Sequence, residues 1–257
     1  ETDTFDTWFS SGQWPLVTLG YPGSPDFKYF YPTDVLETAW EILRLWVSRM
    51  IMFGIYLTGK PPFKDVYLHG IVRALDGRKM SKSLGNVINP EEYQEEFGTD
   101  ALRLGLIVGN GTGKDFNFPR DKVIAARNFA NKIWNIARFV LSYKSEIQNS
   151  KVKSQNTDDE LILKELGTTT KSVTKALENY KFNQAAEEIY DFVWHKFADV
   201  YIEKAKLRIG NWKLEIRNSN EDAQDAIKTL NYVLDTSLRL LHPFMPFVTE
   251  AIWQQGF

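Results

Sequence analysis

The 257-residue chain contains no cysteine, which excludes disulfide bonds and cysteine-ligated zinc sites, and we expect no zinc. It has no run of about 18 apolar residues, so we expect no membrane-spanning helix. Its formal net charge is only −2, so any contact with RNA has to come from a local basic patch. It begins at Glu1 with neither a methionine nor a signal peptide, so we expect it to be part of a longer protein.

The composition is that of a folded protein, with 43% hydrophobic and 25% charged residues, and the length suits one large domain or two ordinary ones. Residues 33–57 are predicted to form a helix, because Thr33 or Asp34 can cap it and Glu37 follows at the spacing of a capping box. Residues 63–72 alternate in polarity and are predicted to form a strand, which makes the first part of the chain α/β.

From residue 119 onward the apolar residues recur at helical spacing. Helices are predicted over residues 119–146, 159–178, 183–207 and 221–241, with a last segment from Pro246. Long amphipathic helices with short connections favour an antiparallel bundle. Between the two parts lies the glycine-rich segment 109–115, which fails the P-loop pattern and which we interpret as a turn. We therefore predict an α/β domain over residues 1–113 and an all-α domain over residues 114–257.

A short loop with two lysines follows the predicted strand. Two lysines can stabilise negative charge that develops on phosphate groups, since each is a compact point charge on a flexible stem. Gly77 and Gly85 bracket the loop and give its backbone freedom to move. The loop consists of Lys79, Met80, Ser81, Lys82 and Ser83.

With its flanks, this loop resembles the KMSKS loop of class I aminoacyl-tRNA synthetases. The resemblance to the valyl-tRNA synthetases extends over nearly the whole chain. It rests on the segments FDTWFSSGQWP (5–15), YPTDVL (31–36), FKDVYLHG (63–70), GTDALR (98–103), RNFANKIWN (127–135) and LHPFMPFVTE (241–250). The first segment favours valine over isoleucine, and an isoleucine-charging relative is the alternative. The resemblance implies the C-terminal half of a Rossmann-like catalytic domain, followed by an α-helical anticodon-binding domain, and a cytoplasmic location.

The resemblance also implies a reaction: the parent enzyme activates valine with ATP, accompanied by Mg²⁺, and ligates the valine to tRNA(Val). Lys79 and Lys82 would be the catalytic residues. Trp8 and Ile42 would form walls of the valine pocket. The ATP site would combine the loop residues Lys79, Met80, Ser81, Lys82 and Ser83 with His69 and Glu41.

Three of these residues also have ordinary structural interpretations. Trp8 can be a core residue, His69 a packed histidine and Glu41 a solvated acid. Glu41 also departs from the aspartate that the family commonly uses to bind the adenosine ribose, and Ala39 departs from its usual glycine. The longer carboxylate would change the geometry of ribose binding.

The predicted helix 119–146 carries apolar residues on one arc and the cations Arg120, Arg127 and Arg138 on another. A basic stripe near an aromatic ring suits single-stranded RNA, because cations hold phosphates and the ring stacks on a base. These three arginines and Phe139 are therefore the predicted tRNA contacts, with the resemblance pointing to Arg120, Arg138 and Phe139 at the anticodon. A solvated helix face is the alternative interpretation.

The chain contains no His-Ile-Gly-His-type motif. In class I synthetases this motif lies upstream of the editing insertion. The resemblance therefore implies that the N-terminal catalytic half and the editing domain of the same polypeptide are missing here. We predict a fragment of a valine–tRNA ligase. The alternative, for the isolated chain, is an inactive module that binds the tRNA anticodon arm.

Overall fold

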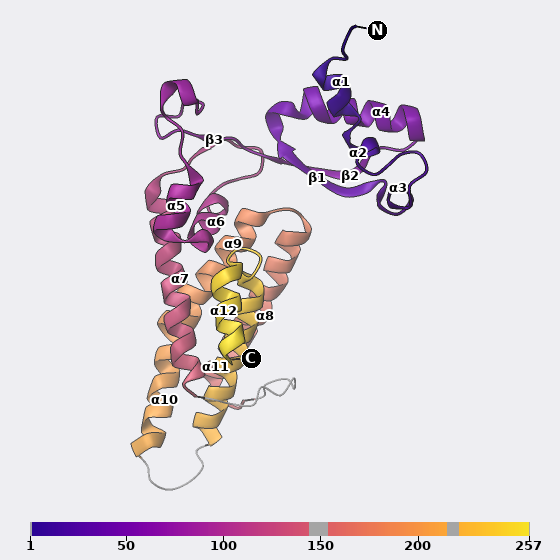
Figure 1. The fold of residues 1–257 in the computed structure, drawn as a ribbon. Coiled ribbons are helices and arrows are strands. Elements are labelled where there is room, and N and C mark those ends of the chain that lie inside the picture. The colour runs from indigo at the N-terminus through magenta and orange to yellow at the C-terminus, as the bar shows by residue number, and fades with distance from the viewer. Residues whose placement is uncertain (1, 144–153, 215–220, 257) are drawn as a thin grey trace. The chain divides into compact units, whose positions relative to one another are not determined.

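The computed structural model describes residues 2–143, 154–214 and 221–256, and its helices and strands are shown in Figure 1. The chain divides into two compact units: unit 1 is Glu1–Lys79 with Gly111–Asn117, and unit 2 is Met80–Asn110 with Phe118–Phe257. The predicted division at residue 113 therefore differs from the structural one. The physical reason is packing: helices before residue 110 pack on the long helix that follows, whereas residues 111–117 pair with a strand of unit 1.

Unit 1 is built on two parallel strands, β1 (Thr33–Ala39) and β2 (Phe63–His69), whose register runs from Thr33 opposite Phe63 to Ala39 opposite His69. Helix α4 (Ser48–Thr58) lies between them in the chain, and α1 (Thr7–Gly12) and α2 (Trp14–Val17) pack against it. Helix α3 (Pro25–Phe30) precedes β1. The core of the unit is a buried apolar cluster of Leu36, Val47, Met50 and Phe63.

The prediction of one helix over residues 33–57 is wrong. The segment forms β1, a 3-10 turn η1 (Trp40–Ile42), a π-helical turn η2 (Leu43–Val47) and only then α4. Leu36 and Thr38 are buried while Glu37 is exposed, which is the period of a strand. The capping-box spacing was misleading, because pairing with β2 satisfies the backbone here in place of helical hydrogen bonds.

A second, very short parallel pair joins β3 (Val72–Arg73) to β4 (Phe116–Asn117), with Val72 opposite Phe116. The amide of Phe116 also donates to the carbonyl oxygen of Ile71 at 3.1 Å. These bonds attach the end of the glycine-rich segment to the chain just before the lysine loop.

Unit 2 is helical, as predicted. Its elements are η3 (Lys82–Leu84), α5 (Pro90–Phe97), α6 (Thr99–Ile107), α7 (Arg120–Leu141), α8 (Thr157–Glu178), α9 (Phe182–Asp191), η4 (Phe192–Tyr201), α10 (Ile202–Leu214), α11 (Glu221–Leu241) and α12 (Pro246–Gly256). Residues 144–146 of the predicted helix 119–146 lie outside the described residues. The predicted helix 183–207 changes to π-helical hydrogen bonding over η4. None of the described helices is long and apolar enough to cross a membrane.

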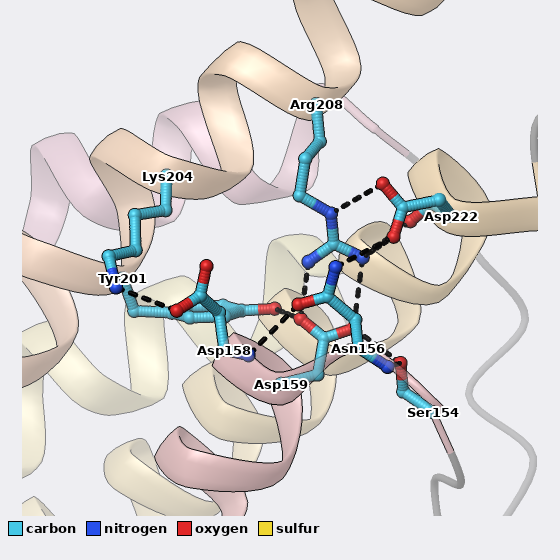
Figure 2. A network of polar contacts seen from close by, with 8 residues as sticks. All are labelled: Ser154, Asn156, Asp158, Asp159, Tyr201, Lys204, Arg208 and Asp222. Atoms are coloured by element: carbon cyan, nitrogen blue, oxygen red, sulfur yellow. Dashed lines mark hydrogen bonds and ion pairs between the residues drawn. The ribbon is translucent and has the colours of Figure 1, made fainter.

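A buried polar cluster connects α8, η4, α10 and α11 (Figure 2). The Asp159 carboxylate is fully buried and accepts hydrogen bonds from the hydroxyls of Tyr201 at 2.6 Å and Ser154 at 2.7 Å. Arg208 donates to Asp159 at 2.5 Å and to Asp222 at 2.6 Å. Burial and the bond to Asp159 raise the pKa of Tyr201 far above its usual value, so the phenol stays a neutral donor. Every charge of the cluster named here therefore has a partner, as a buried charge requires.

Candidate functional site

Lys79 ends a short hairpin of unit 1. The amide of Ala74 donates to the carbonyl oxygen of Arg78 at 3.0 Å, and the amide of Gly77 donates to the carbonyl oxygen of Ala74 at 2.8 Å. Gly77 has a φ of 81°, a left-handed conformation that glycine adopts without strain. Lys79 then pairs with Arg73 in an antiparallel bridge. The turn thus returns the chain alongside β3 and determines where the lysine loop begins.

The structure brings Lys79 and Glu41 together. The Lys79 ammonium lies 3.4 Å from a carboxylate oxygen of Glu41. Glu41 lies in η1 directly after β1, and His69 is the last residue of β2, so both lie at the carboxyl end of the parallel pair. His69 Nε2 is 3.2 Å from a Glu37 carboxylate oxygen. Ligands of open α/β sheets bind at this end of the strands, so the geometry supports a site there.

The rest of the lysine loop belongs to unit 2. The amide of Ser81 donates to the side-chain oxygen of Asn86 at 2.8 Å, and the hydroxyls of Ser81 and Ser83 are 2.7 Å apart. The Met80 sulfur accepts a hydrogen bond from the Ile88 amide, and Lys82 is the first residue of η3. None of these bonds uses the Lys82 ammonium. The loop is thus shaped by its own hydroxyls and by Asn86.

Asp115 connects three parts of unit 1, a role that the sequence did not reveal. Its carboxylate accepts from the Trp40 indole at 2.8 Å, from the Ile71 amide at 2.9 Å and from Arg73 Nε at 2.8 Å. These donors, Trp40 first, then Ile71 and then Arg73, lower the pKa of Asp115 to about 2. The group is therefore an ionised acceptor at neutral pH. The glycine-rich segment that we interpreted as a turn ends in an anchoring residue.

Gly70 provides the space for this segment. A Cβ built on Gly70 would lie 1.7 Å from the carbonyl oxygen of Lys114, which is backbone and has little room to shift. Only glycine fits at this crossing without moving one of the two chains. The residue after His69 is therefore constrained by contact with residues 114–115.

The residues predicted for the valine pocket lie on α1 and η1. Trp8 is half-buried, and the Arg49 guanidinium lies 5.8 Å from the centre of its ring. Arg49 also approaches the Asp6 carboxylate at 3.6 Å. Ile42 is half-buried at the end of η1, directly after Glu41. Trp8 is thus neither a fully buried core residue nor a freely exposed one.

The predicted tRNA contacts fall into two groups along α7. Arg120 and Arg127 both face the buried ring of Phe97, at 5.0 and 5.7 Å, and Arg120 also pairs with Glu96 of α5. These two arginines hold α5 against α7. Arg138 is exposed and lines a pocket of about 270 Å³ formed by residues of α7 and α12.

Phe139, next to Arg138, is half-buried and has other neighbours. The ring of Tyr143 meets it edge-on at 5.4 Å, and the Lys206 ammonium lies 5.3 Å from its centre. A cation and an aromatic edge therefore already surround this ring. In the part of the chain that the structure describes, no group of three or more metal-ligating side chains gathers in one place.

Comparison with known proteins supports this architecture. Residues 1–119 match the family model "tRNA synthetases class I (I, L, M and V)", and residues 159–257 match "Anticodon-binding domain of tRNA ligase". The chain is 46% identical to the valine–tRNA ligase of Geobacillus kaustophilus and 45% identical to that of Bacillus subtilis, in each case over 99% of its length. The chain belongs to the valine–tRNA ligase family. It spans 29% of the length of these relatives.

Solved structures show the class I synthetase fold of this family member. A LeuRS from Agrobacterium radiobacter K84, in a ternary complex with tRNA and LeuAMS, matches 99% of the chain with a TM-score of 0.79 and 24% identity. Methionyl-tRNA synthetase of Mycobacterium tuberculosis bound to methionyl-adenylate matches 96% with a TM-score of 0.75 and 21% identity. The chain covers 32% and 49% of these two proteins.

Proposed function

We propose that the parent protein of this chain activates valine with ATP and ligates it to tRNA(Val). The observation that carries the proposal is the meeting of Lys79, on its hairpin, with Glu41 at the carboxyl end of the β1–β2 pair. Relatives that match the whole chain are named valine–tRNA ligases, which supports valine over isoleucine as the substrate. Residues 1–113 would supply the C-terminal half of a Rossmann-like catalytic domain with its KMSKS loop. Residues 114–257 would supply an antiparallel anticodon-binding bundle.

In the first step the valine carboxylate attacks the α-phosphorus of ATP, and pyrophosphate leaves with its Mg²⁺. Lys79 and Lys82 stabilise the charge on the phosphates, while His69, Glu41, Met80, Ser81 and Ser83 line the nucleotide site. In the second step a terminal ribose hydroxyl of the tRNA attacks the valyl carbonyl, and AMP leaves. Lys79 and Glu41 are both substantially exposed, and such a pair contributes only ~0–1 kcal/mol. A triphosphate, with its higher charge, can therefore take Lys79 from Glu41.

Trp8 and Ile42 would shape the valine pocket. A rigid ring can exclude a longer side chain, but one methylene group discriminates by only ~1–3 kcal/mol. The editing domain that we predict elsewhere in the parent protein would supply the remaining selectivity.

Arg138 and Phe139 are the better candidates for anticodon contacts. Arg138 is exposed, whereas Arg120 and Arg127 already engage Phe97. We therefore expect Arg138 to hold an RNA phosphate, with Arg120 and Arg127 acting mainly through the packing of α5.

Valine-dependent exchange of pyrophosphate into ATP, measured on the full-length parent protein, tests the proposed reaction. We expect Lys82→Ala to lower the exchange rate by ~10²-fold, the typical loss for one charge contact in a transition state. Lys64→Ala is the matched control, because Lys64 is an exposed cation of unit 1 that pairs with Asp34. An unchanged rate in Lys82→Ala would remove this lysine from the mechanism. A wild-type protein without valine-dependent exchange would contradict the whole proposal.

A second candidate function applies to the isolated chain. Because the chain spans only 29% of its relatives and residues 159–257 match an anticodon-binding domain, it can act as a tRNA-binding module without chemistry. Incubation with total tRNA at low salt, followed by sequencing of the bound fraction, tests this function. Enrichment of valine-accepting tRNAs that is weakened by Arg138→Ala would support it. Indiscriminate binding that salt abolishes would show electrostatic attraction alone.

A further inference from the structure

Two series of hydrogen bonds and ion pairs connect the Asp115 carboxylate with Lys79. The first passes through Arg73. Its Nε donates to the Asp115 carboxylate at 2.8 Å, and one of its terminal nitrogens donates to the carbonyl oxygen of Gly77 at 3.4 Å. The same Arg73 forms the antiparallel bridge to Lys79. Asp115 therefore anchors the strand from which the hairpin of Lys79 projects.

The second series passes through Trp40. Its indole donates to Asp115 at 2.8 Å, and the next residue, Glu41, carries the carboxylate 3.4 Å from Lys79. One carboxylate thus holds both the turn that carries Glu41 and the strand that leads to Lys79. These two segments are more than thirty residues apart in the chain, so no local hydrogen bond can fix their separation.

The surroundings keep Asp115 in place. The Lys114 carbonyl oxygen lies against Gly70, leaving no space for a Cβ. Asn117 donates from its side chain to the carbonyl oxygen of Leu75 at 3.4 Å, on the same hairpin. The Asp115 side chain is 18% exposed and that of Arg73 is 35% exposed, so water reaches the pair only partly. The segment that carries Asp115 is therefore held on both sides, by the Lys114 backbone against Gly70 and by the hydrogen bond from the Asn117 side chain.

The chemistry of the anchor requires a carboxylate. An ionised aspartate only accepts hydrogen bonds, and here it faces three donor residues, Trp40, Ile71 and Arg73. An asparagine of the same shape would turn an NH₂ group toward at least one of these donors. It would also leave the Arg73 cation without its counter-ion, in the residue that forms the antiparallel bridge to Lys79.

We propose that Asp115 is a positioning residue for adenylate formation, which holds the Glu41 turn and the Lys79 hairpin in one arrangement through Trp40 and Arg73. The inference rests on the proposed function, since it names a further residue of the same site. Asp115 does not touch the substrate in this role. It determines where Lys79 and Glu41 stand before ATP arrives.

The test uses full-length parent protein carrying Asp115→Asn, assayed by valine-dependent pyrophosphate exchange. A small displacement of a catalytic group costs up to ~10²-fold in rate, so we expect kcat to fall ~10- to 100-fold. The KM for valine should change less than ~2-fold, because the loss is confined to the transition state. The matched control is Asp34→Asn, an exposed carboxylate of unit 1 paired with Lys64, which should leave kcat unchanged.

A second variant and a spectrum separate positioning from simple loss of folding. Trp40→Phe removes one hydrogen bond of the anchor and keeps Arg73 in place, and we expect a several-fold fall in kcat with the thermal midpoint preserved. The Trp40 indole N–H resonance of the isolated chain, assigned by Trp40→Phe, should shift in Asp115→Asn and stay in Asp34→Asn.

The outcomes are distinct. A wild-type rate in both Asp115→Asn and Trp40→Phe overturns the positioning role and leaves the proposed function standing. A fall in kcat that matches the loss of folded protein in both variants overturns it as well. Wild-type protein without valine-dependent exchange overturns the proposed function, and the positioning role with it.

Discussion

Two polar centres of the molecule are built from the same three kinds of side chain but differ in burial. Each combines an aspartate, an arginine and an aromatic donor. In unit 1 these are Asp115, Arg73 and Trp40, and in unit 2 they are Asp159, Arg208 and Tyr201.

The Asp159 centre is largely buried, with Asp159 at 0% and Arg208 at 11% side-chain exposure, and it joins α8, η4 and α10 (Figure 2). The Asp115 centre is more exposed, with side-chain exposures of 18% for Asp115 and 35% for Arg73, and it joins the turn at Trp40 to β3. Removing a partner from the buried centre leaves a charge that neither a partner nor water solvates, so the folded state is destabilised. Removing a partner from the more exposed centre lets water solvate the remaining charge. The main effect is then a change in the geometry of the segments that the centre joins, and the folding free energy changes little. Burial, more than the kinds of side chain, therefore decides whether such a centre determines the stability of the fold or the geometry of the candidate site.

The largest expected effect is that of Arg208→Met in the isolated chain. It leaves the Asp159 carboxylate buried without its cation, and breaking a buried pair in this way costs ~3–5 kcal/mol of unfolding free energy. Denaturant unfolding followed by circular dichroism measures the change. The control is Lys228→Met, which removes an exposed pair with Asp225 on α11 and should change stability by less than ~0.5 kcal/mol. Equal effects of the two variants would contradict the assigned importance of burial.

Tyr201→Phe sharpens the comparison within the buried centre. The variant keeps the ring but removes the hydroxyl that donates to Asp159 at 2.6 Å. A hydrogen bond to a charged group contributes ~1.5–3 kcal/mol, and we expect a loss of that size because Arg208 remains. Thermal unfolding of this variant is compared with Tyr232→Phe, whose partly exposed ring lies on α11. A loss larger than that of Arg208→Met would show that the phenol and not the cation dominates the centre.

Gly70→Ala tests the crossing next to Asp115. The added methyl group would overlap the Lys114 backbone, and overpacking of this kind costs ~1–3 kcal/mol. Gly167→Ala is the matched control: nothing lies near the added Cβ in α8, and removing a helical glycine should raise stability by ~0.5–1 kcal/mol. Opposite signs of the two changes in the unfolding midpoint are the expected result. A stabilising Gly70→Ala would mean that residues 114–115 do not press on Gly70.

The smallest effect is on the titration of Asp115. Its pKa lies at about 2, below the ordinary 3.8, so its contribution to stability is present above 3.8 and is lost as the pH falls toward 2. The Trp40 indole is the largest cause, so Trp40→Phe should raise this pKa toward 3.8 and move the loss to higher pH. Carboxyl carbon NMR between pH 5 and pH 2 measures the midpoint, with Tyr29→Phe as an exposed aromatic control. An unchanged midpoint in Trp40→Phe would contradict the assigned hydrogen bond.

Helices with local signals were predicted well from the sequence. Asn89 caps α5 by accepting from the Glu91 amide at 3.1 Å, and Pro90 occupies the first turn, and both residue types are local signals of a helix start. The predicted helix 221–241 has the bounds of α11, and the predicted apolar arc of α7 is largely buried. Caps and periodicity act over a few residues, so they can be read without the fold.

Elements with distant partners could not be predicted in this way. β1 carries cap-like residues at its start, and only its pairing with β2 makes it a strand. Arg120 and Arg127 belong to the predicted basic arc of α7, but that arc could not predict their contact with the Phe97 ring of another helix. Asp115 carried no recognisable signal, because its donor Trp40 is 75 residues away in the chain.

By itself, the sequence determined the family resemblance, the lysine loop and the ranges of most helices. Motifs and helical periodicity depend only on residues that are close together in the chain. Only the tertiary structure decided that residues 33–39 form a strand, that Lys79 meets Glu41 and that Asp115 anchors both of their segments. Each of these facts depends on groups brought together from distant parts of the chain. Their energies arise from contacts that exist only after folding, and no pattern in a short window of residues can encode them.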